Sequence, residues 1–135
     1  MKESTKNYVR VFEMGCLHKI LGISRRDHIR NSDIRSTLNI QLDVVQKIQR
    51  RRLKYFGHVT RMEGNRFPNV ALYGQVQGQR ERGRPKKRWI DNVREDCAEM
   101  SLDIIGATRL ATSDRDEWRR QVLKLPEHAI ALPGP

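Results

Sequence analysis

The longest apolar repeat in the sequence covers residues 42–62 and predicts a helix with one buried face. Its members recur mostly at spacings of three, and they are Leu42, Val45, Ile48, Leu53, Phe56, Val59 and Met62. The repeat has a gap at Arg50–Arg52, and three consecutive arginines cover most of a helix circumference. At least one of them must therefore point near the buried side, where it either extends its charge to solvent or meets an anion. Gly57 costs about 1 kcal/mol inside a helix, so it predicts a close approach by another backbone or the end of the helix.

Further apolar repeats predict additional helices, so the expected fold is all-α, with about five short-to-medium helices. The first repeat, in residues 7–21, consists of Val9, Phe12, Cys16 and Ile20, with Leu17 and Leu21 beside them. Two later repeats consist of Trp89, Val93, Cys97, Met100, and of Trp118, Val122, Leu125. Trp89 and Trp118 are the largest of these residues, and we expect both to anchor the core.

Several residues mark where these helices are expected to begin or end. Gly22 is expected to end the first helix, because glycine adopts the left-handed conformation without steric cost. Asn31 or Ser32 is the expected N-cap of a short helix, and Ser113 is the expected N-cap of the last one. Residues 103–112 are expected to form a short helix that Gly106 interrupts.

Composition divides the sequence into four segments. Residues 1–62 are a helical segment, residues 63–88 are a basic connector punctuated by glycine and proline, and residues 89–125 hold the C-terminal helices. Residues 126–135 show no periodicity, which predicts a frayed, disordered tail. Within the irregular connector, Val70–Val76 could form a short strand or an extended arm.

Positive charge is concentrated in the middle of the chain. The net charge is +11, and residues 43–94 carry fourteen lysines and arginines against four acids. Such concentration favours a polyanionic partner, RNA or DNA first. An acidic membrane surface fits less well, because the cationic segments lack a long apolar face to insert. No signal peptide or spanning segment is evident, so we expect an intracellular protein without a membrane partner.

Two basic clusters are the candidate phosphate-binding sites. Their members are Lys47, Arg50, Arg51, Arg52 and Lys54 in the first cluster, and Arg80, Arg82, Arg84, Lys86, Lys87 and Arg88 in the second. Tyr55 and Phe56 adjoin the first cluster, where aromatic rings could stack on bases. The alternative is that both rings belong to the core, and this is the interpretation that we favour.

The second cluster contains two short motifs. Arg82-Gly83-Arg84-Pro85 is the core of an AT-hook, in which an extended Arg-Gly-Arg lies in a narrow minor groove. The favoured alternative is a basic loop that closes on a helix begun by Pro85, and both forms would bind phosphate. Pro85-Lys86-Lys87-Arg88 fits a nuclear-import signal, so the nucleus and the cytoplasm are both expected locations.

Metal and catalytic motifs are absent from the sequence. Cys16 and His18 do not have zinc-finger spacing, and no second close pair exists. The two cysteines, Cys16 and Cys97, are interpreted as small buried hydrophobic residues. No phosphate-binding glycine loop and no nucleophile motif occurs. We therefore expect no metal, no cofactor and no enzymatic activity.

Three blocks together resemble the region after the polymerase core of non-LTR (LINE-like) retrotransposon reverse transcriptases. They are Phe12-Glu13-Met14-x-Cys16-Leu17-x-Lys19-Ile20-Leu21-Gly22-Ile23-Ser24 with Arg26–Asn31, then Arg51-Arg52-Leu53-Lys54-Tyr55-Phe56-Gly57-His58-Val59-x-Arg61-Met62, then Gly83-Arg84-Pro85-x-x-Arg88-Trp89-x-Asp91 with Asp114-Arg115-x-x-Trp118-Arg119. The resemblance covers roughly residues 8–122 of the chain.

The resemblance implies a thumb-like role for residues 1–62 and a grip on element RNA or target DNA by the basic clusters. The parent enzymes polymerise DNA on a palm with metal-binding aspartates, including an Asp-Asp pair. This chain contains no such pair, so the resemblance implies a non-catalytic fragment. Its further partner would be the missing polymerase core of the same element.

Two alternatives remain open at this point. The chain could be a degenerate enzyme fragment with no autonomous function, and its exposed apolar faces would then lie around Phe12 and Leu17. It could also be a helical protein-interaction module that uses the helices of Trp89 and Trp118 to pair with another chain.

Overall fold

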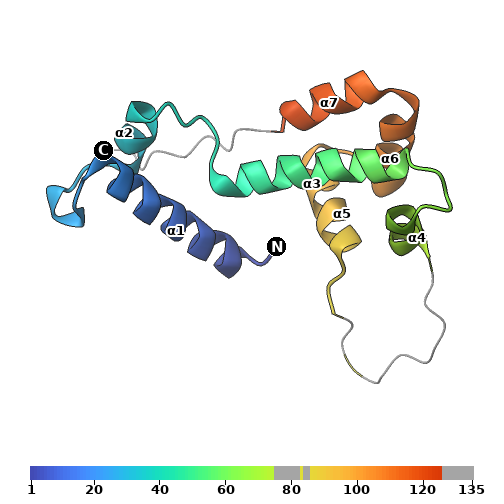
Figure 1. Cartoon of the computed structure of the whole chain (residues 1–135), viewed down its shortest axis with the longest axis horizontal. Helices are drawn as coiled ribbons and strands as arrows, with labels where there is room; N and C mark the ends of the chain where they lie inside the picture. Colours follow the sequence, from blue (N-terminus) through green and yellow to red (C-terminus); the bar gives the residue numbers. More distant parts are fainter. Residues whose placement is uncertain (75–82, 84–85, 126–135) are drawn as a thin grey trace. The chain divides into compact units, whose positions relative to one another are not determined.

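The computed structural model describes residues 1–74, 83 and 86–125, and within these ranges the chain is helical without strands. The all-α expectation is confirmed, although seven α-helices slightly exceed the expected five. Their bounds are α1 Glu3–Leu21, α2 Asn31–Thr37, α3 Val44–Thr60, α4 Phe67–Tyr73, α5 Trp89–Glu99, α6 Ile104–Ser113 and α7 Arg115–Leu123, with a 3-10 turn η1 at Arg25–Asp27 (Figure 1).

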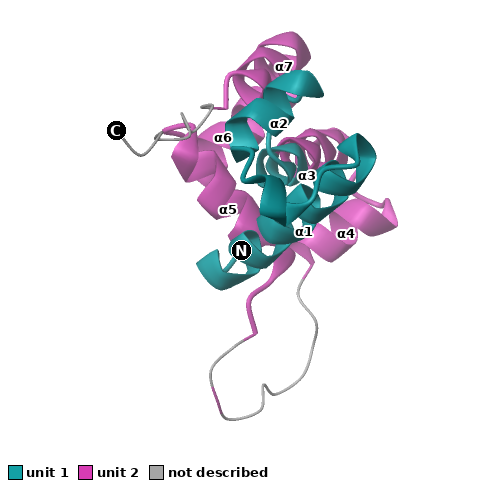
Figure 2. Ribbon diagram, turned by 90° about the vertical axis from the view of Figure 1, so that its left-hand side faces the viewer, with its two compact units in different colours: residues 1–49 teal, residues 50–135 magenta. Residues whose placement is uncertain are grey.

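The chain forms two compact units, Met1–Gln49 and Arg50–Pro135, and the boundary falls inside α3 (Figure 2). The first unit holds α1 and α2 and the start of α3. The second unit holds the rest of α3 and helices α4 to α7. This division lies upstream of the predicted one at residue 62.

In the first unit, α1 packs on α2 with a different face from the one expected. Phe12 and Ile20 were predicted to be buried, but their side chains are 75% and 68% exposed. Leu17, which was expected beside them, is buried, and Glu13, one turn before it, accepts from Arg35 Nη2 of α2 at 2.7 Å. The partner helix, which periodicity does not reveal, decides which side of α1 is covered.

The ends of the first unit's helices are well defined. Gly22 has φ 65°, and its N–H donates to the carbonyls of His18 and Lys19, so the predicted left-handed cap is confirmed. Neither Asn31 nor Ser32 caps α2, because the N-cap is Arg30 and no side chain bonds there.

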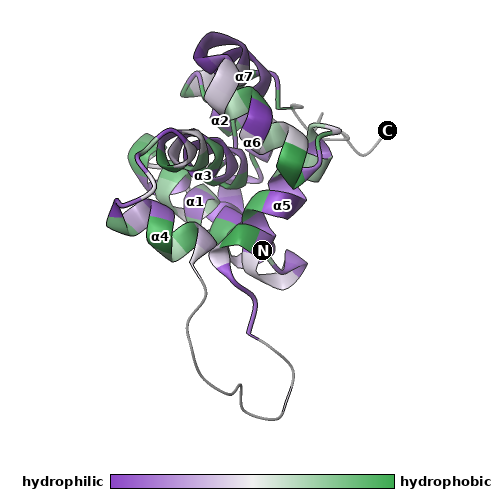
Figure 3. Cartoon of the chain, turned by 90° about the vertical axis from the view of Figure 1, so that its right-hand side faces the viewer, coloured by the Kyte–Doolittle hydropathy of each residue, from purple (hydrophilic) through white to green (hydrophobic). Residues whose placement is uncertain are grey.

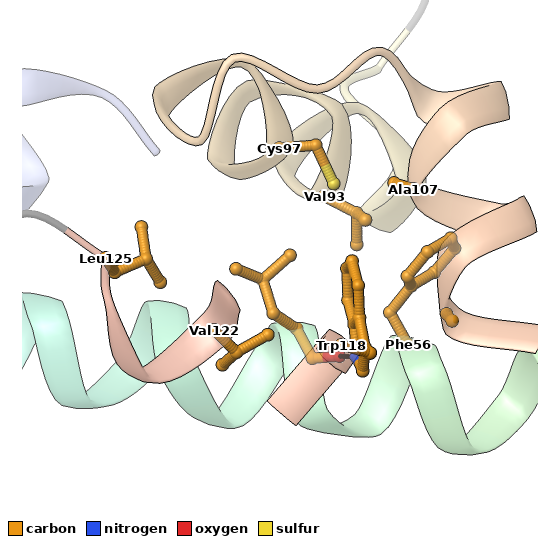
Figure 4. Packing of buried hydrophobic residues seen from close by; sticks show 9 residues of the cluster. Phe56, Val93, Cys97, Ala107, Trp118, Val122 and Leu125 are labelled. Carbon is orange, nitrogen blue, oxygen red and sulfur yellow. Dashed lines mark hydrogen bonds between the residues drawn. The ribbon is translucent and has the colours of Figure 1, made fainter. Parts of the chain in front are cut away.

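The core of the second unit is built around Trp118. Its indole lies between Phe56 and Val122, with Val93 and Cys97 of α5 nearby (Figure 4). Trp118 Nε1 donates to the carbonyl of Leu53 at 3.3 Å, so its one polar atom is satisfied inside the core. The predicted core roles of Trp118, Val93 and Cys97 are confirmed.

Gly57 is the contact that lets Trp118 approach α3. A Cβ at residue 57 would lie 2.3 Å from Trp118 Nε1 and 2.7 Å from Trp118 Cδ1. The helix continues through this position to Thr60. Close approach is therefore the correct prediction for Gly57, although a side chain approaches it rather than a backbone.

The expected irregular connector contains α4. Phe67–Tyr73 is a helix with Pro68 in its first turn, so the prediction of a strand or extended arm is wrong for the described part of Val70–Val76. Asn69 Nδ2 donates to the carbonyls of Val59 and Met62. These bonds satisfy carbonyl groups at the end of α3. Residues 75–82 and the predicted tail, 126–135, lie outside the described ranges.

Two predictions about the last helices are also wrong. Gly106 does not interrupt α6, which begins after the N-cap Asp103, whose Oδ1 accepts from Gly106 N at 2.9 Å. Ser113 ends α6, and the neighbouring Asp114 caps α7 by accepting from the N–H groups of Asp116 and Glu117. A carboxylate is the better cap because it also favours the positive end of the helix.

Apolar and polar residues are mixed along every helix (Figure 3). None of the helices in residues 1–74 and 86–125 combines the length and the apolar character that a membrane span requires.

Candidate nucleic-acid interface

The three consecutive arginines of α3 separate into different environments. Arg52 points toward α5, where its Nη1 lies 2.7 Å from Asp96 Oδ2, and the two side chains are only 10% and 4% exposed. Asp96 is thus the anion that one of these arginines was expected to meet. Because its charge is satisfied inside the protein, Arg52 is not available as a phosphate contact.

Arg50 points toward the end of α7. Its Nη2 donates to the Leu123 carbonyl at 2.6 Å, in the last turn of that helix. The C-terminal carbonyls of a helix lack partners within the helix and carry partial negative charge, so a guanidinium stabilises them. Arg50 Nε is buried without a hydrogen-bond partner in the described part of the chain. Arg50 is therefore mainly a tether between two helices.

The remaining side chains form one exposed face of α3. Arg51, Lys54, Tyr55 and His58 follow one another at i, i+3, i+4 and i+7, and all four are exposed. Neither Arg51 nor Lys54 has an ion pair with any described residue. Two of the predicted cations are thus presented to solvent beside two rings, and the centroids of Tyr55 and His58 are 6.4 Å apart.

Lys47 belongs to the first unit, where its Nζ lies 3.8 Å from Glu13 Oε1. Its side chain is half exposed, so the ion pair is a weak one.

Tyr55 and Phe56 have opposite environments. Phe56 is fully buried, as expected, whereas Tyr55 is 50% exposed, so the prediction that both rings are core is wrong for Tyr55. Successive side chains of a helix point about 100° apart. Leu53, Phe56 and Gly57 share the side of α3 that packs against Trp118, and Tyr55 is rotated away from that side. Tyr55 is left at the edge of the core.

Trp89 also lies at the edge of the core rather than inside it. It is the first residue of α5 and is 38% exposed, so the prediction of a core anchor is wrong in this respect. Its ring meets Tyr55 edge-on, with centroids 5.9 Å apart and an interplanar angle of 77°. The centroid of its ring also lies 6.4 Å from that of the buried Phe56, so Trp89 packs against the edge of the core.

The described part of the second basic cluster leads directly into Trp89. Lys86, Lys87 and Arg88 are all exposed, and Figure 3 shows this hydrophilic segment entering α5. Lys87 Nζ pairs with Glu95 Oε1, and Arg88 lies 3.9 Å from Asp91 Oδ2. Lys86 has no ion pair with a described residue. Arg80, Arg82 and Arg84 lie outside the described ranges, and the last two of these are the arginines of the AT-hook motif.

The hydrogen bond with Glu95 raises the pKa of Lys87, and the same bond lowers the pKa of Glu95. Both shifts favour the charged forms, so the pair persists at neutral pH. Because the pair is exposed, solvent and salt screen it. A phosphate could therefore compete with Glu95 for Lys87.

We call the exposed surface of Arg51, Lys54, Tyr55, His58, Lys86, Lys87, Arg88 and Trp89 the α3–α5 face. The edge contact between Tyr55 and Trp89 joins its two parts. Sequence reasoning missed the exposure of Trp89, although its position in the first turn of a helix was a usable signal. A residue there has fewer turns of its own helix around it than one at mid-helix.

No group of three or more His, Cys, Asp and Glu in residues 1–74 and 86–125 has a geometry that could hold a metal ion. Cys97 is fully buried, and burial, with the charges of Asp96 and Asp103, raises the pKa of its thiol to about 12. Cys16 is only partly buried, which departs from the expectation of two buried cysteines. The raised pKa keeps the Cys97 thiol protonated, so this cysteine lacks the thiolate character of a reactive one.

Comparison with known proteins produced no match to a family model, to a curated protein or to a solved structure.

Proposed function

We propose that the chain binds single-stranded nucleic acid, RNA or DNA, through the α3–α5 face and has no catalytic activity of its own. The observation that carries the proposal is the exposed Tyr55–Trp89 pair among cations that lack buried partners. Proteins that bind single strands combine backbone-neutralising cations with aromatic rings on which bases stack.

A single strand suits this face better than a duplex does. In a duplex the bases are stacked on one another, so their faces cannot reach Tyr55 or Trp89. A single strand can place a base on either ring while its phosphates meet Arg51, Lys54 and the cations before α5. Base stacking on these rings therefore contributes to the binding free energy of a single strand and not to that of a duplex.

The proposal narrows the set of binding cations that the sequence predicts. Arg50 and Arg52 hold helices together, and Lys47 is paired with Glu13, so we assign phosphate contacts to Arg51, Lys54, Lys86, Lys87 and Arg88. Arg80, Arg82 and Arg84 stay in the proposal through their charge and their place in the sequence.

The resemblance to retrotransposon reverse transcriptases supports the same class of ligand. Two of its three blocks contain the α3–α5 face, namely the block around Tyr55 and the block that ends near Trp89. In this proposal the chain is a thumb-side, non-catalytic fragment, and the polymerase core of the same element is its further partner.

Replacement of Tyr55 by Leu tests the aromatic part. The variant keeps an apolar side chain but loses the ring, and stacking contributes about 1–3 kcal/mol per base. We expect Tyr55→Leu to weaken single-stranded binding about tenfold and to leave duplex binding unchanged. Fluorescence is a direct reporter, because the exposed Trp89 should be quenched by a stacked base and the buried Trp118 should not.

The matched control is Tyr8→Leu, which removes a tyrosine of α1 that is even more exposed, at 77% against 50% for Tyr55. Equal losses of affinity in the two variants, or a loss on duplex as large as on single strands, would contradict stacking at Tyr55.

A second candidate is a degenerate enzyme fragment without autonomous function. The observation that favours it is the apolar surface of α1, where Tyr8, Val11, Phe12 and Ile20 are all exposed. Such residues fit a helix that once packed on a larger protein. A broad, weakly cooperative thermal transition together with dye binding to apolar surface would support this candidate. A sharp transition of a monomer would support an independent module.

A protein-interaction module that uses the helices of Trp89 and Trp118 has less support. Trp118 is buried in its own unit and has no ring surface to offer a second chain.

A further inference from the structure

Arg61 lies beside the junction of α6 and α7. It follows the last residue of α3, and its Nη1 donates to the Ala111 carbonyl at 2.7 Å, near the end of α6. This bond uses one of the five N–H donors of the guanidinium. Arg61 is only partly buried, so other donors face the surface next to the start of α7.

Two further arginines gather at this place. Arg115 and Arg119 are exposed and lie one turn apart on α7, and neither has an ion pair with any described residue. Burial lowers the pKa of Arg61, and the positive charges of Arg115 and Arg119 lower it further, so the three guanidinium groups repel one another. By contrast, Arg120 on the same helix is neutralised by Glu117 at 2.8 Å.

The two acids that flank Arg115, Asp114 and Asp116, form no ion pair with the three arginines in the described part of the chain. Asp114 accepts two backbone N–H groups as the cap of α7, and these bonds hold its carboxylate at the helix end. Three guanidinium groups without an ion pair repel one another, and like charges one turn apart, as at Arg115 and Arg119, also destabilise a helix. An anion that binds between them would remove this repulsion.

We propose that Arg61, Arg115 and Arg119 form a phosphate-binding site and that its ligand is a backbone phosphate of a nucleic-acid strand. Guanidinium groups match the oxygens of phosphate with paired N–H donors, which favours phosphate over a simple halide. The strand part of this inference rests on the proposed function. Binding of a free phosphate group at the same three arginines does not.

The position of Arg61 explains why a strand is the expected source. Lys54 and His58 lie one turn apart on α3, and Arg61 comes three residues after His58, just past the end of the helix. The exposed face of α3 therefore leads to the arginine cluster. From Arg51 to Thr60, the last residue of α3, the helix rises about 14 Å. A strand on the α3–α5 face would therefore reach the cluster with a further phosphate.

The test compares two double variants of the full chain that change the same net charge on the same helix. Arg115→Gln with Arg119→Gln removes the cluster, and Arg120→Gln with Lys124→Gln is the matched control, an exposed pair with similar spacing. The probes are inorganic pyrophosphate and a single-stranded oligonucleotide. The readouts are thermal melting and the NMR signals of the arginine side-chain N–H groups.

Without ligand at low salt, we expect the cluster variant to melt above the wild type, since repulsion is removed. The control should melt lower, because Arg120 loses Glu117. Pyrophosphate should shift the Arg61 signals in the wild type and the control, and the cluster variant should bind it at least about tenfold more weakly. On the oligonucleotide, the log–log salt slope should lose about 1.4 in magnitude for two single-strand contacts.

Equal pyrophosphate binding by the cluster variant and the control would overturn the site. If pyrophosphate binding is lost but the oligonucleotide slope is unchanged, the site takes only free phosphate, and the strand part is overturned. If the wild type binds pyrophosphate at Arg61 but no oligonucleotide, the proposed function fails while the phosphate site stands.

Discussion

At the scale of single residues, Gly57 is a position in the core of the second unit that has no space for a side chain. A methyl group there would overlap the indole of Trp118, which is buried and packs against Phe56 in the core. We expect Gly57→Ala to lower the free energy of unfolding by about 2 kcal/mol, despite the higher helix propensity of alanine. Denaturant unfolding measures the change.

The control for this prediction is Gly15→Ala in α1, where an added Cβ meets nothing within 4 Å. At residue 15 the higher helix propensity of alanine is not opposed by a steric clash, so the variant should be more stable by up to about 1 kcal/mol. A Gly57→Ala variant as stable as the wild type would show that Trp118 does not contact α3 as described.

Cys97 gives the protein a specific sensitivity to alkaline pH. Its thiol has an ordinary pKa of 9.0, which burial, with Asp96 and Asp103, raises to about 12 in the folded chain. Between these values the unfolded chain releases the proton and the folded chain keeps it, so stability falls as pH rises. We expect Cys97→Ala to flatten the loss of stability between about pH 9 and pH 12. Parallel curves for wild type and variant would contradict the raised pKa.

At the scale of secondary structure, the ion pair of Arg52 with Asp96 joins α3 to α5. Removing one partner leaves the other charge buried, which typically costs about 3–5 kcal/mol. We expect Arg52→Met to destabilise the chain by about 3 kcal/mol, and Asp96→Leu in the same chain to restore most of the loss.

Arg51→Met is the control for this cycle, because Arg51 is exposed and its replacement should change stability by less than about 0.5 kcal/mol. A large loss from Arg51 and none from Arg52 would reverse the assignment of the two arginines.

Much of the helical architecture could be predicted from the sequence, because apolar periodicity carries it. The observed bounds of α3, α5 and α7 lie close to the predicted ones. The buried face of α1 could not be predicted, since it depends on α2, and neither could α4, where the sequence Phe67–Tyr73 is too short for a periodic signal. The N-cap of α7 was missed by one residue, because Ser113 and Asp114 are both good caps.

The candidate site could be predicted only in part, for a physical reason that Arg50–Arg52 illustrates. Charge density located the cations, but it did not distinguish Arg51, which faces solvent, from Arg52, which faces Asp96. That difference depends on which helix packs on each side of α3. The same applies to Tyr55 and Phe56. It also applies to Arg61, which is far in the sequence from Arg115 and Arg119.

At the scale of the whole molecule, the central claim is that a defined face, rather than overall charge, binds nucleic acid. A protein with net charge +11 would bind polyanions weakly through any of its surfaces. If net charge alone determines binding, every pair of exposed cations contributes equally to the affinity for nucleic acid. If the α3–α5 face binds, the cations of that face contribute more than those elsewhere.

The most direct test is the salt dependence of single-stranded oligonucleotide binding, measured for three proteins. They are the wild type, Arg51→Gln with Lys54→Gln, and the equal-charge control Arg25→Gln with Arg26→Gln in the exposed turn η1. We expect a wild-type log–log slope of at least about 3 in magnitude, a loss of about 1.4 in the first variant and no change in the control. A wild-type slope near zero, or equal losses in both variants, would contradict the claim.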